Sequence, residues 1–250
     1  MSERQGDVHV LGAKAQLFAF TADRIRRLSQ EAVATGGRFA AAFSGGHTPV
    51  GLYAELALPD PAIDWSKTDV FLVDERVVPF EDSLSNFGMI KKTLLDAIPI
   101  PQENLHPIPI DQEDQCSAAR IYEDEMRSFF RAPPGVTPRF DLVLLGIGED
   151  GHTASLFPGS PLLDESTRLA VAVPESNGRT ARITLTLPVI NNAQEVIFLV
   201  AGKTKAPIIK RAIEEEDGRL PASRVRPREG RLSFHLDGDA ASLLAAPVGL

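Results

Sequence analysis

Cysteine, long apolar runs and excess positive charge are all scarce in this 250-residue sequence. The single cysteine, Cys116, excludes an internal disulfide and is typical of a reducing compartment. No apolar stretch approaches the length of a membrane span, and residues 1–7 lack the apolar region of a signal peptide. The sequence therefore predicts a cytoplasmic protein without a membrane partner.

The charge balance excludes another class of partner. A formal net charge of −8 argues against nucleic acid as the main partner. An anionic small substrate would need a local cationic pocket that works against this global field. The proline-rich coils at 99–111 and 131–139 flank a helix rather than dividing two cores, so residues 1–250 are expected to form a single domain. The oligomeric state is open between a monomer and a small homo-oligomer.

Apolar runs of strand length alternate with amphipathic stretches of helix length. Strands are expected at residues 38–43, 69–73, 105–108, 140–145, 169–173, 179–188, 195–201 and 232–236. Helices are expected at 13–35, from Thr48 onward, and at 85–95, 112–131, 189–193, 203–215 and 239–245. Within residues 112–131, the expected core positions are Ile121, Tyr122, Met126 and Phe129. Several strands are apolar on both faces, which predicts an α/β fold whose mostly parallel sheet has helices on both faces.

The stretch from Phe140 to Phe157 is the first place to look for chemistry. An apolar strand leads into a glycine-rich turn that carries Asp150 and His152. Open α/β sheets bind their ligands at the carboxyl ends of strands, where this turn must lie. The turn is therefore a candidate active-site loop.

The same turn contains Gly146-x-Gly148-x-x-Gly151, the pattern of a dinucleotide fingerprint. Its context does not fit, because Pro158, Gly159 and Pro161 interrupt the helix that a dinucleotide site needs after the third glycine. The acids at 149 and 150 would also repel a diphosphate. We therefore expect no nicotinamide or flavin cofactor.

A second glycine turn follows the strand at 38–43, in the run Ser44-Gly45-Gly46-His47-Thr48-Pro49. Thr48 can cap the following helix, with Pro49 in its first turn. A strand, a glycine pair and a helix start can cradle an oxyanion on backbone N–H groups. The nucleotide phosphate loop is excluded, because no Gly-Lys-Ser/Thr follows. A plain turn between strand and helix is the alternative.

Charged residues stand at two further strand ends. Asp74, Glu75 and Arg76 follow the strand at 69–73, where they could form part of a site or a capping acid beside a surface ion pair. Lys203 and Lys205 stand at an expected helix start, which is unfavourable to the helix dipole unless they face an anion. Two solvated lysines are the alternative.

Taken together, these motifs resemble the 6-phosphogluconolactonases of the glucosamine-6-phosphate isomerase/6-phosphogluconolactonase family. The resemblance lies, in the family's order, in residues 44–49, 74–76, 85–87, 146–158, 182–186, 200–206 and 220–222. It implies a Rossmann-like α/β fold shared with glucosamine-6-phosphate deaminases. It also implies hydrolysis of 6-phospho-D-glucono-1,5-lactone to 6-phosphogluconate, the second step of the oxidative pentose phosphate pathway.

Two positions depart from the family's pattern. His47 stands where the family has serine or threonine, which changes any side-chain contact with the substrate there but leaves backbone cradling intact. Phe157 stands near the position of an acid that the deaminases use in ring opening, which favours a lactonase over a deaminase or isomerase. A non-catalytic sugar-phosphate sensor is a further alternative, although it would have no need of His152.

The resemblance assigns roles to individual residues. His152 is the expected general base, since an imidazole pKa near ~6.5 suits neutral pH. Asp150 would fix its tautomer or brace the loop. Arg76 would face the developing negative charge, with Asp74 and Glu75 orienting it or contacting hydroxyls. The expected phosphate-binding residues are Ser44, Gly45, Gly46, His47, Thr48, Arg182 and Lys205, with Arg179 and Lys203 as further candidates.

Two other kinds of catalysis are not expected. No Gly-x-Ser-x-Gly motif is present, so an acyl-enzyme is not predicted, although Ser44 and Ser155 remain possible nucleophiles. Asp74, Asp150 and His152 could together bind zinc, yet no His-x-x-x-His or paired-cysteine spacing supports a metal site. The sequence therefore predicts catalysis without a metal or cofactor.

Overall fold

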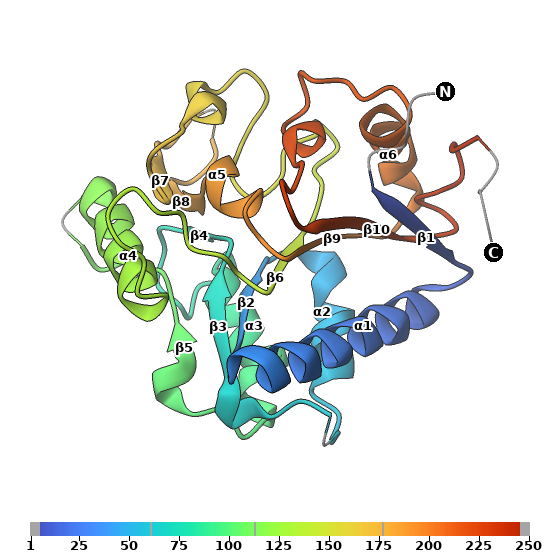
Figure 1. Ribbon diagram of the computed structural model, residues 1–250. Coiled ribbons are helices and arrows are strands. Elements are labelled where there is room, and N and C mark those ends of the chain that lie inside the picture. Colours follow the sequence, from blue (N-terminus) through green and yellow to red (C-terminus); the bar gives the residue numbers. More distant parts are fainter. Residues whose placement is uncertain (1–5, 61, 113, 177, 246–250) are drawn as a thin grey trace.

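The computed structural model describes residues 6–60, 62–112, 114–176 and 178–245 (Figure 1). Its main sheet has seven strands, all pairing in parallel. In spatial order they are β1 (Asp7–Leu11), β10 (Arg231–Asp237), β9 (Glu195–Val200), β6 (Leu142–Leu145), β2 (Phe39–Phe43), β3 (Thr68–Leu72) and β5 (Leu105–His106). Every residue of β2, β3, β6 and β9 is buried, as expected for a parallel sheet covered on both faces.

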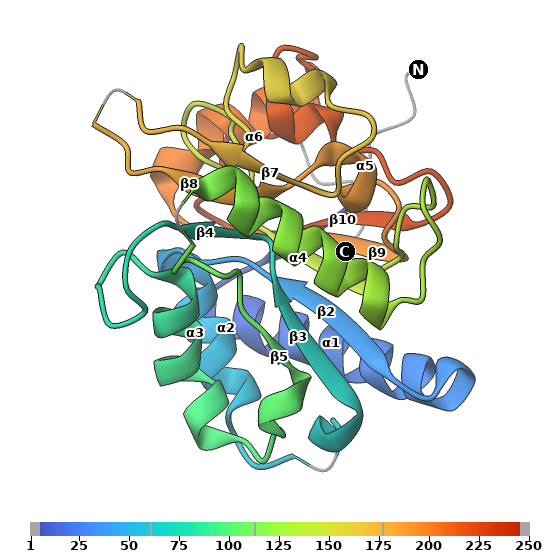
Figure 2. The ribbon, with the colours of Figure 1, turned by 90° about the vertical axis from the view of Figure 1, so that its left-hand side faces the viewer.

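Helices cover both faces of this sheet. They are α1 (Lys14–Gly36), α2 (His47–Leu56), α3 (Asn86–Thr93), α4 (Gln115–Phe129), α5 (Leu187–Ile190) and α6 (Ala206–Ile213). Figures 1 and 2 show α1, α2 and α3 on one side of the sheet and α4, α5 and α6 on the other. The predicted α/β fold is confirmed. None of the described helices has the length and apolarity needed to cross a membrane.

A second, smaller sheet was not predicted. It is antiparallel, in the order β4 (Asp74–Arg76), β8 (Arg182–Leu185) and β7 (Ala170–Val173). Val73 joins the two sheets, because its N–H donates to Phe43 O at 2.9 Å and its carbonyl accepts from Leu185 N at 2.8 Å. The charged residues 74–76 therefore form a strand of their own rather than the end of the preceding strand.

Other local predictions were wrong. Thr48 does not cap α2, which begins at His47 after Gly46 and has no side-chain cap. Ile121, which was expected in the core, is exposed. Tyr122 and Met126, which lie one turn apart on the buried face of α4, are fully buried. Residues 239–245 form turns rather than a helix, and β1 was not foreseen.

Ser85 caps the start of α3. Ser85 Oγ accepts a hydrogen bond from Gly88 N at 3.0 Å. This cap satisfies one of the N–H groups that a helix start leaves free. It also fixes the position of Asn86, which follows immediately and reaches the site described below.

Candidate active site

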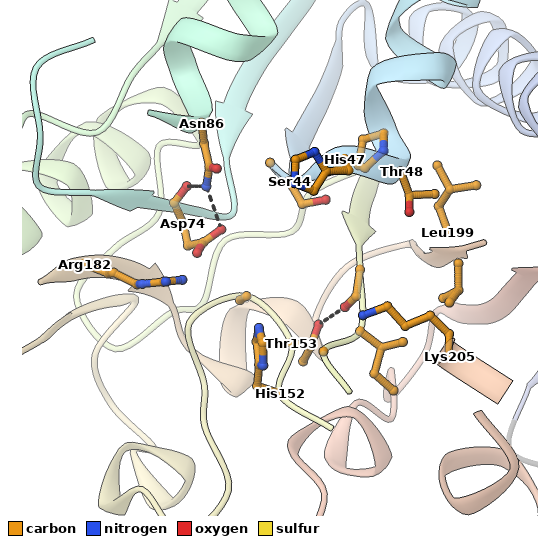
Figure 3. A pocket seen from close by; sticks show the side chains of 18 of the residues that line it. Ser44, His47, Thr48, Asp74, Asn86, His152, Thr153, Arg182, Leu199 and Lys205 are labelled. Atoms are coloured by element: carbon orange, nitrogen blue, oxygen red, sulfur yellow. Dashed lines mark hydrogen bonds between the residues drawn. The ribbon is translucent and has the colours of Figure 1, made fainter. Parts of the chain in front are cut away.

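A cavity of about 270 Å³ opens at the carboxyl ends of the central parallel strands, beside the small sheet (Figure 3). Its walls come from the loop after β2, from β4, from the start of α3, from the turn after β6, from β8, from the end of β9 and from the turn that precedes α6. The lining residues are Ser44, Gly45, Gly46, His47, Thr48, Pro49, Asp74, Arg76, Asn86, Gly146, Ile147, Gly148, His152, Thr153, Ala154, Arg182, Leu199, Val200 and Lys205. The fold therefore brings the two glycine turns of the sequence into one site.

The turn after β6 is tightly closed on itself. Gly148 N donates to His152 O at 2.8 Å, and Gly151 N donates to Gly148 O at 2.9 Å. A Cβ atom at 148 would lie 2.0 Å from His152 Nδ1 and 2.6 Å from Asp150 Oδ1. Only glycine allows the backbone to approach these two side chains so closely. The turn thus fixes His152 beside Asp150.

His152 lies at the cavity wall, held by one ring nitrogen. Its Nδ1 is 2.5 Å from Asp150 Oδ1, and its side chain is 29% exposed. Among the described residues, none hydrogen-bonds Nε2. An acceptor at Nδ1 favours the tautomer with its proton on Nδ1, which leaves Nε2 free to accept a proton. The imidazole does not point into the apolar interior.

Asp150 is suited to this role because it stays ionised. Burial by itself would raise the pKa of Asp150, but the hydrogen bond from His152 and the nearby charges of His152 and Arg179 hold it below its ordinary value of 3.8. Arg179 Nη2 lies 3.4 Å from Asp150 Oδ2. Asp150 itself stands behind the imidazole and does not line the cavity.

The turn after β2 faces His152 across the cavity (Figure 3). Gly46 has a φ of +104°, a conformation that favours glycine, and it immediately precedes α2. The first N–H groups of a helix have no partner within the helix and favour an anion. Ser44 Oγ is buried and has no hydrogen-bond partner among the described residues. The turn therefore offers both backbone and side-chain donors.

Arg76 and Arg182 are directly opposed neighbours on β4 and β8. Like charges at such positions repel each other. Among the described residues, no carboxylate oxygen lies within 4.0 Å of either guanidinium, and each buries an Nε without a hydrogen-bond partner. Burial is the main cause that lowers the pKa of Arg182, and the charges of Arg76 and Arg179 add to it. An anion in the cavity would relieve these unfavourable contacts.

Lys205 supplies a third cation from the opposite end of the cavity (Figure 3). It belongs to a short 3₁₀ turn, Lys203–Lys205, that precedes α6. No carboxylate of the described residues lies within 4.0 Å of its amine. Lys203, by contrast, is exposed and does not line the cavity.

Asp74 is buried at the cavity wall, and both of its carboxylate oxygens are occupied. Oδ1 accepts from Asn86 Nδ2 at 3.2 Å, and Oδ2 accepts from Ser155 Oγ at 2.5 Å. Asn86 also packs so closely on the first glycine turn that a Cβ at Gly45 would lie 1.7 Å from its Oδ1. The sequence had placed Asn86 in a family motif but gave it no role.

Glu75 does not face the cavity, although the sequence suggested a contact with substrate hydroxyls. It is fully buried, and its carboxylate accepts from Ser85 Oγ at 3.0 Å and from the amides of Arg76, Asn86 and Phe87 at 2.7 Å each. Burial raises the pKa of Glu75, against these hydrogen bonds. It anchors the start of α3 to β4 from behind the site.

Comparisons with known proteins show the family of this chain. The family model "Glucosamine-6-phosphate isomerases/6-phosphogluconolactonase" matches residues 12–234. The chain belongs to this family. A 6-phosphogluconolactonase from Synechocystis is 41% identical over 216 residues, which cover 86% of this chain and 88% of that protein.

Two solved structures have a similar fold. The 6-phosphogluconolactonase from Trypanosoma cruzi has a TM-score of 0.83 at 29% identity, covering 96% of this chain and 97% of that one. A monomeric glucosamine-6-phosphate deaminase has a TM-score of 0.79 at 20% identity, covering 95% and 99%. The second likeness shows a shared fold only.

The two positions that depart from the family's pattern both lie at the site. His47 lines the cavity, and the Phe157 ring lies 4.8 Å from the His152 ring. Arg179 and Arg182 stand 4.4 and 5.6 Å from the Phe157 centroid. A carboxylate at 157 would pair with these guanidiniums, whereas phenylalanine leaves Arg182 without a carboxylate partner among the described residues and Arg179 paired with Asp150. The described residues contain no group of three His, Cys, Asp or Glu side chains that could hold a metal ion.

Proposed function

We propose that this member of the family is a 6-phosphogluconolactonase that hydrolyses 6-phospho-D-glucono-1,5-lactone to 6-phosphogluconate. One observation carries the proposal. The His152 imidazole, held by Asp150 through Nδ1, presents its other nitrogen to a cavity that also contains three cations without a carboxylate partner among the described residues. A base and an anion-binding pocket are the two requirements of this reaction.

His152 Nε2 takes a proton from a water molecule, and the resulting hydroxide adds to C1 of the lactone. The carbonyl oxygen becomes an oxyanion, which the guanidinium of Arg76 stabilises. The bond between C1 and the ring oxygen then breaks. The proton on His152 passes to the ring oxygen, which leaves as a hydroxyl of the open-chain acid.

The phosphate is held at the other end of the substrate. The backbone N–H groups of Gly45, Gly46 and Thr48 and the Ser44 hydroxyl would donate to its oxygens, with Lys205 and Arg182 supplying positive charge. His47 borders the same space. Arg179 is assigned instead to the support of Asp150, because it lies outside the cavity lining.

We further propose that the chain acts as a single domain, as a monomer or small homo-oligomer, without a metal or cofactor. A cytoplasmic location fits the single cysteine. The net charge of −8 disfavours nucleic acid as a partner.

A coupled assay with freshly generated lactone tests the function, after correction for the spontaneous opening of the ring. Wild-type protein should accelerate 6-phosphogluconate formation in proportion to its concentration. Ammonia released from glucosamine 6-phosphate would instead identify a deaminase, and binding without turnover would identify a sensor.

The Lys205→Ala variant tests the phosphate site. It should raise KM by about 10- to 150-fold with a smaller change in kcat, since a charged hydrogen bond contributes about 1.5–3 kcal/mol. Lys92→Ala, at an exposed lysine on α3, is the matched control and should leave KM unchanged. An unchanged KM in Lys205→Ala would remove this residue from the pocket.

A further inference from the structure

Ser155 occupies a place in the fold that the proposed reaction does not yet use. Its side chain is fully buried and does not line the cavity. It therefore cannot attack a substrate as a nucleophile, which disposes of one alternative left open by the sequence. Its hydroxyl nevertheless lies between two residues that do line the cavity.

The contacts of Ser155 join three elements. Its Oγ donates to Asp74 Oδ2 on β4 at 2.5 Å and accepts from Arg182 Nη1 on β8 at 3.4 Å. Its backbone N–H donates to Thr184 Oγ1 at 3.2 Å. A hydroxyl has one proton and two lone pairs, so it can serve an acceptor-only carboxylate and a donor-only guanidinium at once. The single hydroxyl thus stands between opposite charges.

We propose that Ser155 is a positioning residue that keeps Arg182 aimed into the cavity by preventing its direct pairing with Asp74. This inference rests on the proposed function, in which Arg182 holds the phosphate. Asp74 is the counter-charge that acts most directly on Arg182, yet no ion pair within 4.0 Å joins them. Asn86 already holds Oδ1 of Asp74, so Ser155 occupies the remaining oxygen.

Loss of the hydroxyl would leave Oδ2 of Asp74 buried and without a partner. An unpaired buried carboxylate oxygen is costly, and the guanidinium of Arg182, which already contacts the same hydroxyl, is a donor able to satisfy it. Arg182 would then turn toward Asp74, and its charge would be neutralised within the protein. The substrate's phosphate would lose a ligand although Arg182 is still present.

A double-mutant cycle tests this role. Ser155→Ala should raise KM for the lactone by about tenfold, with kcat changed by no more than about threefold, because the phosphate rather than the reacting carbon loses a contact. In an Arg182→Ala background, Ser155→Ala should have almost no additional effect on KM. Equal effects of Ser155→Ala in both backgrounds would show that Ser155 acts independently of Arg182 and would overturn the proposal.

Three controls separate positioning from general stability. Ser233→Ala removes another buried hydroxyl, which contacts His235 at 3.2 Å away from the cavity, and should leave KM unchanged. Ser155→Cys keeps the volume but donates weakly, so it carries the same test if Ser155→Ala does not fold. By calorimetry, Ser155→Ala should have a lower affinity for 6-phosphogluconate but an unchanged affinity for gluconate. An equal loss of affinity for both ligands would contradict the proposal.

These measurements also distinguish a failure of the proposed function from a failure of the positioning role of Ser155. If wild-type protein shows no lactonase activity, the proposed function fails. If wild-type protein is active and Ser155→Ala retains its KM, the positioning role alone fails.

Discussion

Two histidine–carboxylate pairs lie in different parts of this molecule and have opposite surroundings. His152 at the cavity is held through Nδ1 alone, and its ring is partly exposed. His106 on β5 lies 2.7 Å from Glu125 through Nδ1 and 3.3 Å from Asp69 through Nε2, and it stacks on Phe71 with a centroid distance of 4.0 Å. One ring has a free nitrogen at a cavity, whereas the other has none.

These surroundings separate a candidate catalytic histidine from a structural one. Burial by itself would lower the pKa of His106, but hydrogen bonds to Asp69 and Glu125 raise it above its ordinary value of 6.5. The protonated form of His106 is therefore favoured by an ion-pair cluster that includes Arg38 beside Asp69. A partner at each nitrogen stabilises the fold and leaves no site for proton transfer.

The largest expected effect comes from breaking the pair at the cavity. His152→Gln should lower kcat by about 10² to 10⁴, because the general base is lost. Binding of 6-phosphogluconate, measured by calorimetry, should change little. Hydrolysis at near wild-type rate in this variant would refute the assignment of His152 as the base.

A smaller effect is expected from the acid behind the base. Asp150→Asn should lower kcat by about 10 to 10², since the amide can still accept a hydrogen bond from Nδ1 but no longer carries the charge that supports the imidazolium. Steady-state kinetics on the folded variant provide the measurement. A loss as large as that of His152→Gln would mean that Asp150 takes part directly in the reaction.

The smallest effect on activity is expected at His106. His106→Gln should keep kcat close to wild type and lower the free energy of unfolding by about 1–3 kcal/mol near pH 5, because buried charge-assisted hydrogen bonds are lost. Urea unfolding at several pH values measures the difference. His9→Gln, on a ring without a carboxylate partner among the described residues, gives the baseline for losing an imidazole.

The difference in unfolding free energy between wild type and His106→Gln should depend on pH in one direction. Because the folded pKa of His106 is raised above 6.5, its stabilisation is complete below pH 6.5 and is lost as the pH rises through the folded value. The pKa of Asp69 is lowered below 3.8, so its contribution is present above pH 3.8 and is lost at more acidic pH. A gap between wild type and variant that widens toward alkaline pH would contradict this account.

Much of the site was predictable because its residues follow apolar runs. Buried strands have a clear signature, and the end of each predicted strand placed residues 44–48 and 146–152 at one edge of the sheet. The small sheet was not predictable in the same way. Residues 74–76 are charged and have no strand pattern, and their pairing with β8 depends on a partner that lies far along the chain.

Other errors have similar causes. The helical pattern of α4 could not say which residues border the buried face, so Ile121 was wrongly placed in the core. Glu75 and Asp74 are adjacent in sequence, but alternation along β4 sends one behind the site and the other into its wall. The sequence marked Ser155 only as a possible nucleophile, because its hydrogen bonds are made to two residues that are distant in the chain.

Gly146 and Gly148, in the turn after β6, differ in how well they would tolerate substitution. A methyl group at Gly148 would overlap the paired imidazole and carboxylate, whereas one at Gly146 meets no heavy atom within 4 Å. A motif search that treats the two glycines as equivalent does not show this difference in steric constraint. Libraries intended to reshape the cavity floor should therefore leave position 148 untouched and can begin with alanine at 146.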